Sequence, residues 1–340
     1  MKNKICVLGG GSWGTTIASH LAKNGHTVSL WEFMEAQVQE MKIKRKLSFL
    51  PQLQIPKSLI ITSKMEEALK DAEIIFSIVP SQFVRSTWKN AKQYLPEKTQ
   101  AVVSLSKGIE NNSLLTMTEI IREECPLLQN KIVVVSGPSH AEEVALEIPT
   151  AIIAASKQKQ LAEKIQQLLS TPYLRIYTHP DILGAELCGS LKNIFAIACG
   201  GCDGLGLGDN TKAALVTRGL NEMAKLGAKM GAQQITFFGL AGMGDLIVTC
   251  FSKHSRNRLL GEKIGQGKTA ESALKEMTMV AEGYPTSKSA FQLLQKYNCD
   301  CPIITEIYKV LYESKNIKDS LHDLLNRPVH NEIENTQWSN

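Results

Sequence analysis

The sequence predicts an α/β fold, in which a doubly wound and mostly parallel sheet is followed by an all-helical C-terminal domain. In the first half, short runs rich in Val and Ile alternate with amphipathic stretches, a pattern typical of a parallel sheet with helices on both faces. After about residue 180 the apolar residues follow helical spacing, and no clear strand pattern appears. A glycine-rich turn directly after the first strand-like run supports the same fold class.

The expected elements follow from these patterns in order. Strands are predicted at residues 4–9, 26–32, 59–63, 72–80, 100–106, 130–138, 149–156 and 173–179. Amphipathic helices are predicted at 15–25 and 64–72, and then at 185–201, 211–231, 255–267, 272–277, 285–298 and 305–313. We therefore divide the chain into domains at 1–182 and 183–330, and we expect the patternless tail 331–340 to be disordered.

Composition and charge exclude several classes of protein. The 340 residues carry a net charge of +5, and the lysines and arginines are scattered rather than gathered in one stripe, which argues against a nucleic-acid partner. Glycines interrupt the first apolar run after five residues, which is too short for a secretory signal. No other apolar run approaches the ~20 residues that span a bilayer. We expect a cytoplasmic protein without membrane insertion.

The eight cysteines include a C-x-x-C, Cys199 with Cys202, and a C-x-C, Cys299 with Cys301. A zinc site or a redox pair is one interpretation. A redox C-x-x-C usually opens a helix after a strand, however, whereas this one ends an apolar helical run beside two glycines. We favour small residues that fill a crowded place in a reduced compartment, and we assign no metal ligands.

The glycine-rich turn has the context of a dinucleotide site. Gly9, Gly11 and Gly14 form G-x-G-x-x-G between the first expected strand and the first expected helix. Glu32 ends the second strand 18 residues after Gly14, near the ~20-residue spacing of an acid that binds ribose. Glycines allow the backbone to approach a pyrophosphate, and the helix N-terminus supplies N–H donors. The motif predicts a Rossmann-type domain that binds NAD or NADP.

Glu32 also bears on which of the two cofactors is preferred. A carboxylate at this position hydrogen-bonds the ribose hydroxyls of NAD and repels a 2′-phosphate. Phe33 and Met34, which follow it, supply no cation to hold that phosphate. We expect NADH to be preferred over NADPH.

Lys192 lies in the apolar run 187–206, where a buried ammonium needs compensation. Four further stretches gather polar groups that a packed fold does not need. Lys107 follows one expected strand, and Gly137 with Ser139 follows the next, so both stretches lie at the carboxyl edge of the sheet. A third stretch, residues 239–250, is rich in glycine and nearly uncharged, and it carries Asp245 and Thr249.

The fourth stretch is the mouth of a helix. Ser255 can cap the helix that begins after it, which places Arg256 and Asn257 in the first turn. A cation is unfavourable there for the helix dipole unless an anion binds, because a phosphate would accept from the turn's N–H groups and from the guanidinium. A capped surface helix with a solvated arginine is the alternative.

Together these motifs resemble the bacterial NAD(P)-dependent sn-glycerol-3-phosphate dehydrogenases. The resemblance spans roughly residues 5–315 and runs, in the family's order, through "GGGSWGTT", "LSKGIE", "SGPSHAEEV", "LCGSLKN", "GLGLGDN", "GLAGMGDLIVTC", "SRNRLLG", "VAEGYPT" and "CPIITEIYKVLYE". It implies reduction of dihydroxyacetone phosphate to sn-glycerol 3-phosphate, a precursor of phospholipids. The segment Glu32–Met34 departs from the family, where it is commonly basic or contains histidine, and this weakens the expectation of an NADPH contact there.

The resemblance also implies roles for individual residues. Lys192 matches the proton-transferring lysine, and Lys107 and Asp245 match residues beside it. Substrate positions fall on Lys107, Gly137, Ser139, Asn193, Asp245 and Thr249, and the phosphate grip falls on Ser255, Arg256 and Asn257. Cofactor positions fall on Gly9, Gly11, Ser12, Trp13, Gly14, Glu32, Phe33, Lys107, Ala141, Arg256, Val280 and Glu282.

Lys192 then has a chemical task. As hydride reaches a carbonyl carbon, charge grows on the oxygen, and a nearby ammonium can stabilise that charge and donate a proton. Apolar surroundings and Lys107 should lower the pKa of Lys192, while Asp245 should raise it, and the sequence leaves the net value open.

Two other functions remain as alternatives. A 3-hydroxyacid or ketopantoate-type reductase shares the architecture but has no reason to carry "SRN" at a helix mouth. A non-catalytic dinucleotide-binding regulator needs the glycine loop but not Lys192 with Asp245. We also expect a homodimer, from the resemblance and from the apolar helices of the second domain.

Overall fold

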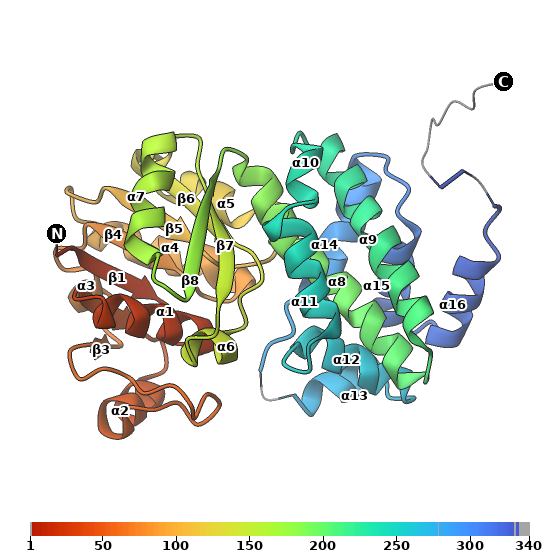
Figure 1. The fold of residues 1–340 in the computed structure, drawn as a ribbon, viewed down its shortest axis with the longest axis horizontal. Coiled ribbons are helices and arrows are strands. Elements are labelled where there is room, and N and C mark those ends of the chain that lie inside the picture. Colours follow the sequence, from red (N-terminus) through yellow and green to blue (C-terminus); the bar gives the residue numbers. More distant parts are fainter. Residues whose placement is uncertain (1, 278, 330, 333–340) are drawn as a thin grey trace.

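The computed structural model describes residues 2–277, 279–329 and 331–332. It has a sheet-containing body and a helical body, which lie side by side (Figure 1). The last strand ends at His179, and the first long helix of the second body begins at Ile182. Most of the tail that we expect to be disordered, residues 333–340, lies outside the described residues.

All eight expected strands are present in one sheet. They are β1 (Lys4–Leu8), β2 (Thr27–Trp31), β3 (Ile60–Thr62), β4 (Ile74–Ser77), β5 (Ala101–Ser104), β6 (Ile132–Ser136), β7 (Thr150–Ala155) and β8 (Leu174–His179). Their order is β3-β2-β1-β4-β5-β6-β7-β8, and every neighbouring pair is parallel except β6 with β7. The predicted mostly parallel, doubly wound sheet is confirmed, and its strand order reverses between β1 and β4, where such folds bind ligands.

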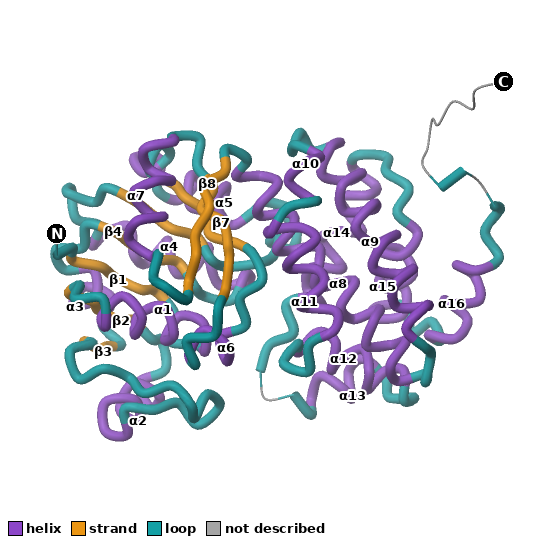
Figure 2. Tube along the Cα trace, in the orientation of Figure 1, coloured by secondary structure: helices purple, strands orange, loops and turns teal. Residues whose placement is uncertain are grey.

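Helices cover both faces of this sheet (Figure 2). They are α1 (Ser12–Lys23), α2 (Glu35–Lys44), α3 (Met65–Leu69), α4 (Val84–Ala91), α5 (Met117–Glu124), α6 (Ala141–Ala145) and α7 (Lys159–Leu169), with short turns η1 (Ser81–Phe83), η2 (Lys92–Tyr94) and η3 (Pro126–Leu128). Alternate residues of β1 serve the two faces: Ile5 and Val7 pack in the core with α1 and α7, and Cys6 and Leu8 in the core with α4 and α5. Both sides of the strands are therefore apolar.

The second body is helical throughout its described residues. It consists of α8 (Ile182–Gly204), α9 (Asp209–Lys229), α10 (Gln234–Phe237), the π-helical turn η4 (Leu240–Gly244), α11 (Asp245–Phe251), α12 (Arg256–Gly265), α13 (Ala270–Lys275), α14 (Gly283–Lys296), α15 (Pro302–Tyr312) and α16 (Ile317–Leu325). The pattern did not predict α16 or the helices from α10 to α11. The latter segment is rich in glycine, and Gly242 lies so close to the Phe237 carbonyl that a side chain would overlap it.

Helix α8 is the central helix of this body, and residues are buried on all its sides. By length and mean hydropathy, α8 and the segment 234–251 could each cross a bilayer, which corrects the expectation that no apolar stretch is long enough. The apolar window of α8 is 94% buried within the protein, and that of 234–251 is 44% buried. Burial on all sides is what a core helix of a large domain requires.

Helices α8 and α12 pack backbone against backbone. A Cβ on Gly200 of α8 would overlap the carbonyl of Arg258, and a Cβ on Gly261 of α12 would overlap the carbonyl of Ile197. Gly204 and Gly265, one turn further along, approach the facing backbone in the same way. These glycines therefore fix how α12 lies along α8.

We predict that Gly261→Ala destabilises the protein, because neither backbone can yield without moving a helix. The expected loss is about 1–3 kcal/mol or more in the free energy of unfolding, as for overpacked cores. Gly208→Ala is the matched control, since a Cβ there meets nothing within 4 Å and its φ is −80°. Thermal melts followed by circular dichroism should show a lower Tm for Gly261→Ala only. An unchanged Tm would contradict the close packing.

Candidate active site

A buried carboxylate joins two lysines from the two bodies. Asp245, the first residue of α11, accepts from Lys192 Nζ at 2.5 Å and from Lys107 Nζ at 2.6 Å, through different oxygens. Lys192 lies in the middle of α8, and Lys107 follows β5. Lys192 Nζ also donates to Thr249 Oγ1 at 2.6 Å. The four residues thus form one hydrogen-bonded group at the carboxyl edge of the sheet.

Burial decides the charge state of this group. The side chain of Asp245 is 1% exposed and that of Lys192 is 8% exposed, whereas Lys107 is 21% exposed. Burial lowers the pKa of Lys192 to about 8; the Asp245 carboxylate opposes this shift, and the Lys107 ammonium adds to it. Burial also opposes ionisation of Asp245, but the two ammonium groups outweigh it and hold the pKa of that carboxyl below its usual range. Lys192 is therefore an ammonium that can release its proton near neutral pH.

The local sequence explains the position of Asp245. The π-helical turn η4 places Asp245 at the start of α11, and Thr249 lies one helical turn later, where its hydroxyl donates to the Asp245 carbonyl at 2.6 Å. The wide turn depends on Gly242, which packs against Phe237. A π-helical turn is a common feature of functional sites.

Lys107 is held by the loop that carries it. Its Nζ also donates to the Gly137 carbonyl at 3.2 Å, and the same carbonyl accepts from Ser139 Oγ at 2.9 Å. Gly137 has a φ of +138°, which favours glycine, and a Cβ there would press against Ile152. Because β5 and β6 are parallel neighbours, their ends bring Lys107 and Gly137 together as expected.

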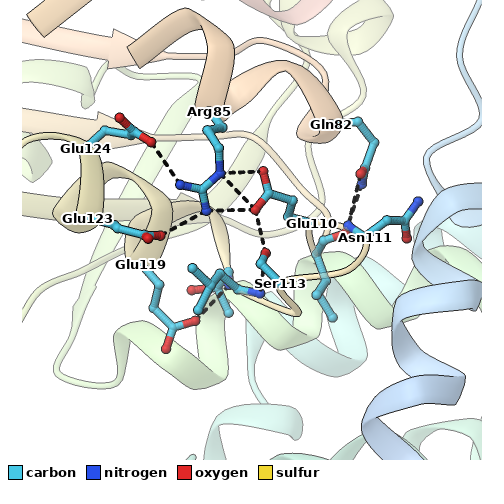
Figure 3. A network of polar contacts seen from close by, with 11 residues as sticks. Gln82, Arg85, Glu110, Asn111, Ser113, Glu119, Glu123 and Glu124 are labelled. Carbon is cyan, nitrogen blue, oxygen red and sulfur yellow. Dashed lines mark hydrogen bonds and ion pairs between the residues drawn. The ribbon is translucent and has the colours of Figure 1, made fainter. Parts of the chain in front are cut away.

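Arg85 on α4 anchors the rest of that loop, a feature the sequence analysis missed (Figure 3). Its guanidinium contacts the Glu110 carboxylate through Nε and Nη2 at 2.8–3.1 Å, and it also pairs with Glu123 and Glu124 on α5 at 2.9 Å. From the next body, Ser289 of α14 donates to the Ile109 carbonyl at 3.1 Å. The loop after Lys107 is thus fixed from both bodies.

A pair of asparagines connects Lys192's neighbourhood to the helix mouth. Asn257 Nδ2 donates to Asn193 Oδ1 at 2.9 Å, and Asn257 Oδ1 accepts from the Gly283 amide at 2.8 Å. Asn193 is 5% exposed and Asn257 is 8% exposed. These contacts leave the Asn257 side chain one N–H for a ligand. The backbone N–H of Asn257 lies in the first turn of α12, where it has no acceptor within the helix, so it can donate to a ligand as well.

The helix mouth itself has the predicted form. Ser255 Oγ accepts from the Arg258 amide at 3.2 Å, so Ser255 is the N-cap of α12. Arg256 Nη2 lies 3.5 Å from both Ser12 Oγ of α1 and Glu142 Oε1 of α6. Arg256 therefore links the mouth of α12 to the glycine loop and to α6 of the sheet-containing body.

The glycine loop fits a dinucleotide. Gly9 has a φ of +113°, and a Cβ there would lie 2.5 Å from the Ile78 carbonyl, at the switch point between β1 and β4. Gly14 packs as closely against Gly9, whereas a Cβ on Gly11 would meet nothing within 4 Å, so the backbone at the start of α1 is open to a ligand. The first-turn amides, at Ser12 and Trp13, have no partners within the helix. These residues would hold the pyrophosphate of NAD(P).

Glu32 lies beside this loop, but it is already engaged. Its Oε2 accepts from the Gly10 amide at 2.9 Å, and its Oε1 accepts from the Met34 amide at 3.0 Å. A carboxylate has further lone pairs, so ribose hydroxyls can still be bound. Phe33 is 79% exposed next to it and could cover an adenine.

The other expected cofactor residues divide into two groups. Ala141 begins α6 next to Ser139 and is 7% exposed. Val280 is 55% exposed and precedes α14. Glu282 instead binds Ser81, accepting from its amide at 3.0 Å and from its hydroxyl at 2.5 Å. Sequence reasoning missed Ser81, which begins η1 just beyond the carboxyl end of β4, at the edge where ligands bind.

The cysteines fit the packing interpretation. All eight are free and buried, and within the described chain no group of three or more His, Cys, Asp or Glu is placed to hold a metal. Cys199 and Cys202 flank Gly200 and Gly201, where α8 meets α12 and α16. Burial raises the pKa of the Cys202 thiol to about 11, which keeps it a poor nucleophile.

Known proteins match this chain in both of its bodies. The family described as NAD-dependent glycerol-3-phosphate dehydrogenase N-terminus matches residues 4–162, and its C-terminus counterpart matches residues 181–322. The chain is 44% identical over 332 residues to a glycerol-3-phosphate dehydrogenase (NAD(P)+) of Fusobacterium nucleatum, covering 97% of this chain and 99% of that one. It is 47% identical over 329 residues to that of Citrifermentans bemidjiense, covering 96% and 98%.

Solved structures separate the family from its wider fold. A glycerol-3-phosphate dehydrogenase from Coxiella burnetii superposes with a TM-score of 0.91 at 36% identity, covering 96% of this chain and 99% of that one. A ketopantoate reductase from Ralstonia eutropha reaches a TM-score of 0.58 at 14% identity, covering 94% and 100%, and so shares only the fold. Matched in both domains and at this identity, the chain belongs to the NAD-dependent glycerol-3-phosphate dehydrogenase family.

Proposed function

We propose that this chain is an sn-glycerol-3-phosphate dehydrogenase, which reduces dihydroxyacetone phosphate reversibly with NAD(P)H. The observation that carries the proposal is the Lys192–Asp245–Lys107 group, which joins the two bodies in a structure where Arg256 at the mouth of α12 also contacts Ser12 of the glycine loop. The product is a backbone for glycerophospholipids, and we assign the enzyme to that biosynthesis.

The residues of the chain have distinct tasks in this reaction. NAD(P)H, held at the glycine loop, supplies the hydride. Lys192 stabilises the charge that grows on the carbonyl oxygen and donates its proton there, and in the reverse direction neutral Lys192 takes the alcohol proton. Asp245 keeps Lys192 charged and aimed, and Lys107 adds a second positive charge. Thr249 and the Gly137 carbonyl accept from the two lysines, and Ser139 donates to the same carbonyl.

The phosphate of the substrate belongs at the helix mouth. Amides of the first turn of α12 and the Arg256 guanidinium provide donors and positive charge for a dianion, together with Ser255 and Asn257. A 3-hydroxyacid or ketopantoate-type reductase binds a carboxylate substrate and needs no phosphate site at a helix mouth, so this arrangement argues against that alternative. A regulator without turnover would need no buried lysine pair.

We also propose a preferred cofactor, an oligomeric state and a location for this enzyme. Glu32, with no cation after it, favours NADH over NADPH. Ile235, Phe238, Ile247 and Phe251 are 45–69% exposed along the segment from α10 to α11, and a homodimer would cover such a stripe. Light scattering that gives the monomer mass would refute the dimer. We assign the enzyme to the cytoplasm.

The test of the function is a spectrophotometric assay. Loss of absorbance at 340 nm is followed with dihydroxyacetone phosphate, with NADH and NADPH in parallel. A kcat/KM that is far lower for unphosphorylated dihydroxyacetone than for dihydroxyacetone phosphate supports the proposal. Absence of turnover in protein shown to bind a cofactor would overturn it, and a ketone with a carboxylate would be tried next.

We predict that Lys192→Ala lowers kcat by more than ~10²-fold, because the proton donor is lost. Binding of NADH should change little, since Lys192 belongs to α8 and not to the glycine loop, and Asp245 keeps Lys107 as a partner. Steady-state kinetics and a fluorescence titration with NADH measure the two effects. Near-wild-type turnover would exclude the catalytic role.

We predict that Glu32→Gln raises the ratio of kcat/KM for NADPH over that for NADH by roughly tenfold, because a repelling charge near the 2′-phosphate is removed. The amide side chain has one acceptor oxygen in place of two, so it can keep the contact with the Gly10 amide or with the Met34 amide, but not both. The kcat/KM for NADH in the variant shows how far the loss of one contact disturbs the loop. Glu35→Gln, which removes the same charge at the exposed start of α2, is the control. Equal ratios in both variants would rule out discrimination by Glu32.

A further inference from the structure

A compact ionic cluster lies at the C-terminal end of α8, beyond Lys192. Asp203, in the last turn of α8, pairs with Lys212 of α9 at 2.8 Å and with Arg258 of α12. The three side chains are only 10–19% exposed. Figure 1 shows α8, α9 and α12 converging on this end of the helical body. Asp203 is about 16 Å from Lys192 at the rise of an α-helix, so it cannot touch the reacting atoms.

The guanidinium of Arg258 holds the segment that precedes α12 in place. Its Nε donates to the Ser252 carbonyl at 3.1 Å, its Nη1 binds Asp203, and its Nη2 lies 3.1 Å from Glu262. Ser252 is the C-cap of α11, and its carbonyl also accepts from the Ser255 amide at 3.3 Å. Arg258 therefore ties the end of the helix that carries Asp245 to the start of the helix that carries the phosphate grip.

Only four residues, 252–255, connect α11 to α12, so the position of Ser252 determines that of Ser255. The backbone contact of α12 with α8 fixes the body of α12, but its first residues precede that contact. Lys212 completes the cluster, since its Nζ binds Asp203 and lies 4.8 Å from the centre of the Phe251 ring. The connection is thus held from α8 and α9 at once.

We propose that Asp203, through Arg258, is a positioning residue that aims the phosphate grip of Ser255, Arg256 and Asn257 at the substrate. This inference rests on the proposed function. Asp203 orients the Arg258 fork, Arg258 holds the Ser252 carbonyl, and the connection then presents the first turn of α12 in the geometry that a phosphate requires.

The charge of the cluster lets an experiment distinguish loss of positioning from a change in electrostatic attraction, because the two effects shift the KM in opposite directions. Lys212 and Arg258 balance Asp203 and Glu262, so the cluster has no net charge. Asp203→Asn adds one positive charge near the site, which by attraction alone would tighten the binding of a dianion and lower its KM. A loss of positioning does the opposite.

The experiment compares Asp203→Asn with Glu262→Gln. Both variants remove one negative charge beside Arg258, but Glu262 only makes an i,i+4 pair on α12 and is 30% exposed. We expect Asp203→Asn to raise the KM for dihydroxyacetone phosphate and the Ki for inorganic phosphate together, roughly tenfold, with kcat within about threefold. Glu262→Gln should leave both constants near wild type. Reduction of unphosphorylated dihydroxyacetone should have an unchanged kcat/KM in Asp203→Asn, because Lys192 and Asp245 are undisturbed.

Three results would overturn the proposal: an unchanged or lower KM in Asp203→Asn, an equal shift in Glu262→Gln, or a parallel fall of kcat and of dihydroxyacetone reduction. If Asp203→Asn does not fold, Arg258→Lys replaces it, since it keeps the charge and loses the Nε donor to Ser252; the same increases in KM and Ki are expected. If wild type lacks turnover, the proposed function fails, and calorimetric binding of sn-glycerol 3-phosphate to the same variants still decides the positioning role.

Discussion

The site depends on one buried carboxylate with two ammonium partners. Asp245 lies on the helical body, Lys192 lies beside it on α8, and Lys107 extends from the sheet. The contacts of Asp245 therefore hold the two bodies together at the proposed active site. Leaving one charge of such a group without its partner costs about 3–5 kcal/mol. The same enclosure that makes the pair expensive also lowers the pKa of Lys192, which turns a structural cost into a usable acid.

Two rigid contacts then set the distances across the site. Glycines bring α8 and α12 into backbone contact, so the helix mouth has a fixed place along the helix that carries Lys192. On the other side, Arg85, Ser289 and Glu282 hold the edge of the sheet, so the loop of Lys107 and the turn after β4 cannot drift from the helical body. The arrangement leaves catalytic groups on helices and strand ends, which are more precise supports than free loops.

The sequence predicted the strands, the glycine loop and the Ser255 cap, because each leaves a local signal: Val and Ile runs, a glycine spacing, and a hydroxyl before a helix. Residues whose roles depend on distant partners gave no such signal. Ser81 and Arg85 gain meaning only through Glu282 and Glu110, and the helix at Asp245 was hidden by glycines that a π-helical turn requires. The roles of Lys192 and Asp245 came from the resemblance, and only the folded chain shows the direction of the Lys192 pKa shift.

The titration of Lys192 tests this account most directly. In protein labelled with ¹³C at the lysine ε-carbons, the Lys192 resonance can be assigned by its loss in Lys192→Met and followed against pH by NMR. We predict a titration midpoint near the pKa of about 8 for Lys192 in wild type. The midpoint should be lower in Asp245→Asn, because the carboxylate that favours the ammonium is gone. A wild-type midpoint near the ordinary lysine value, or no response to Asp245→Asn, would contradict it.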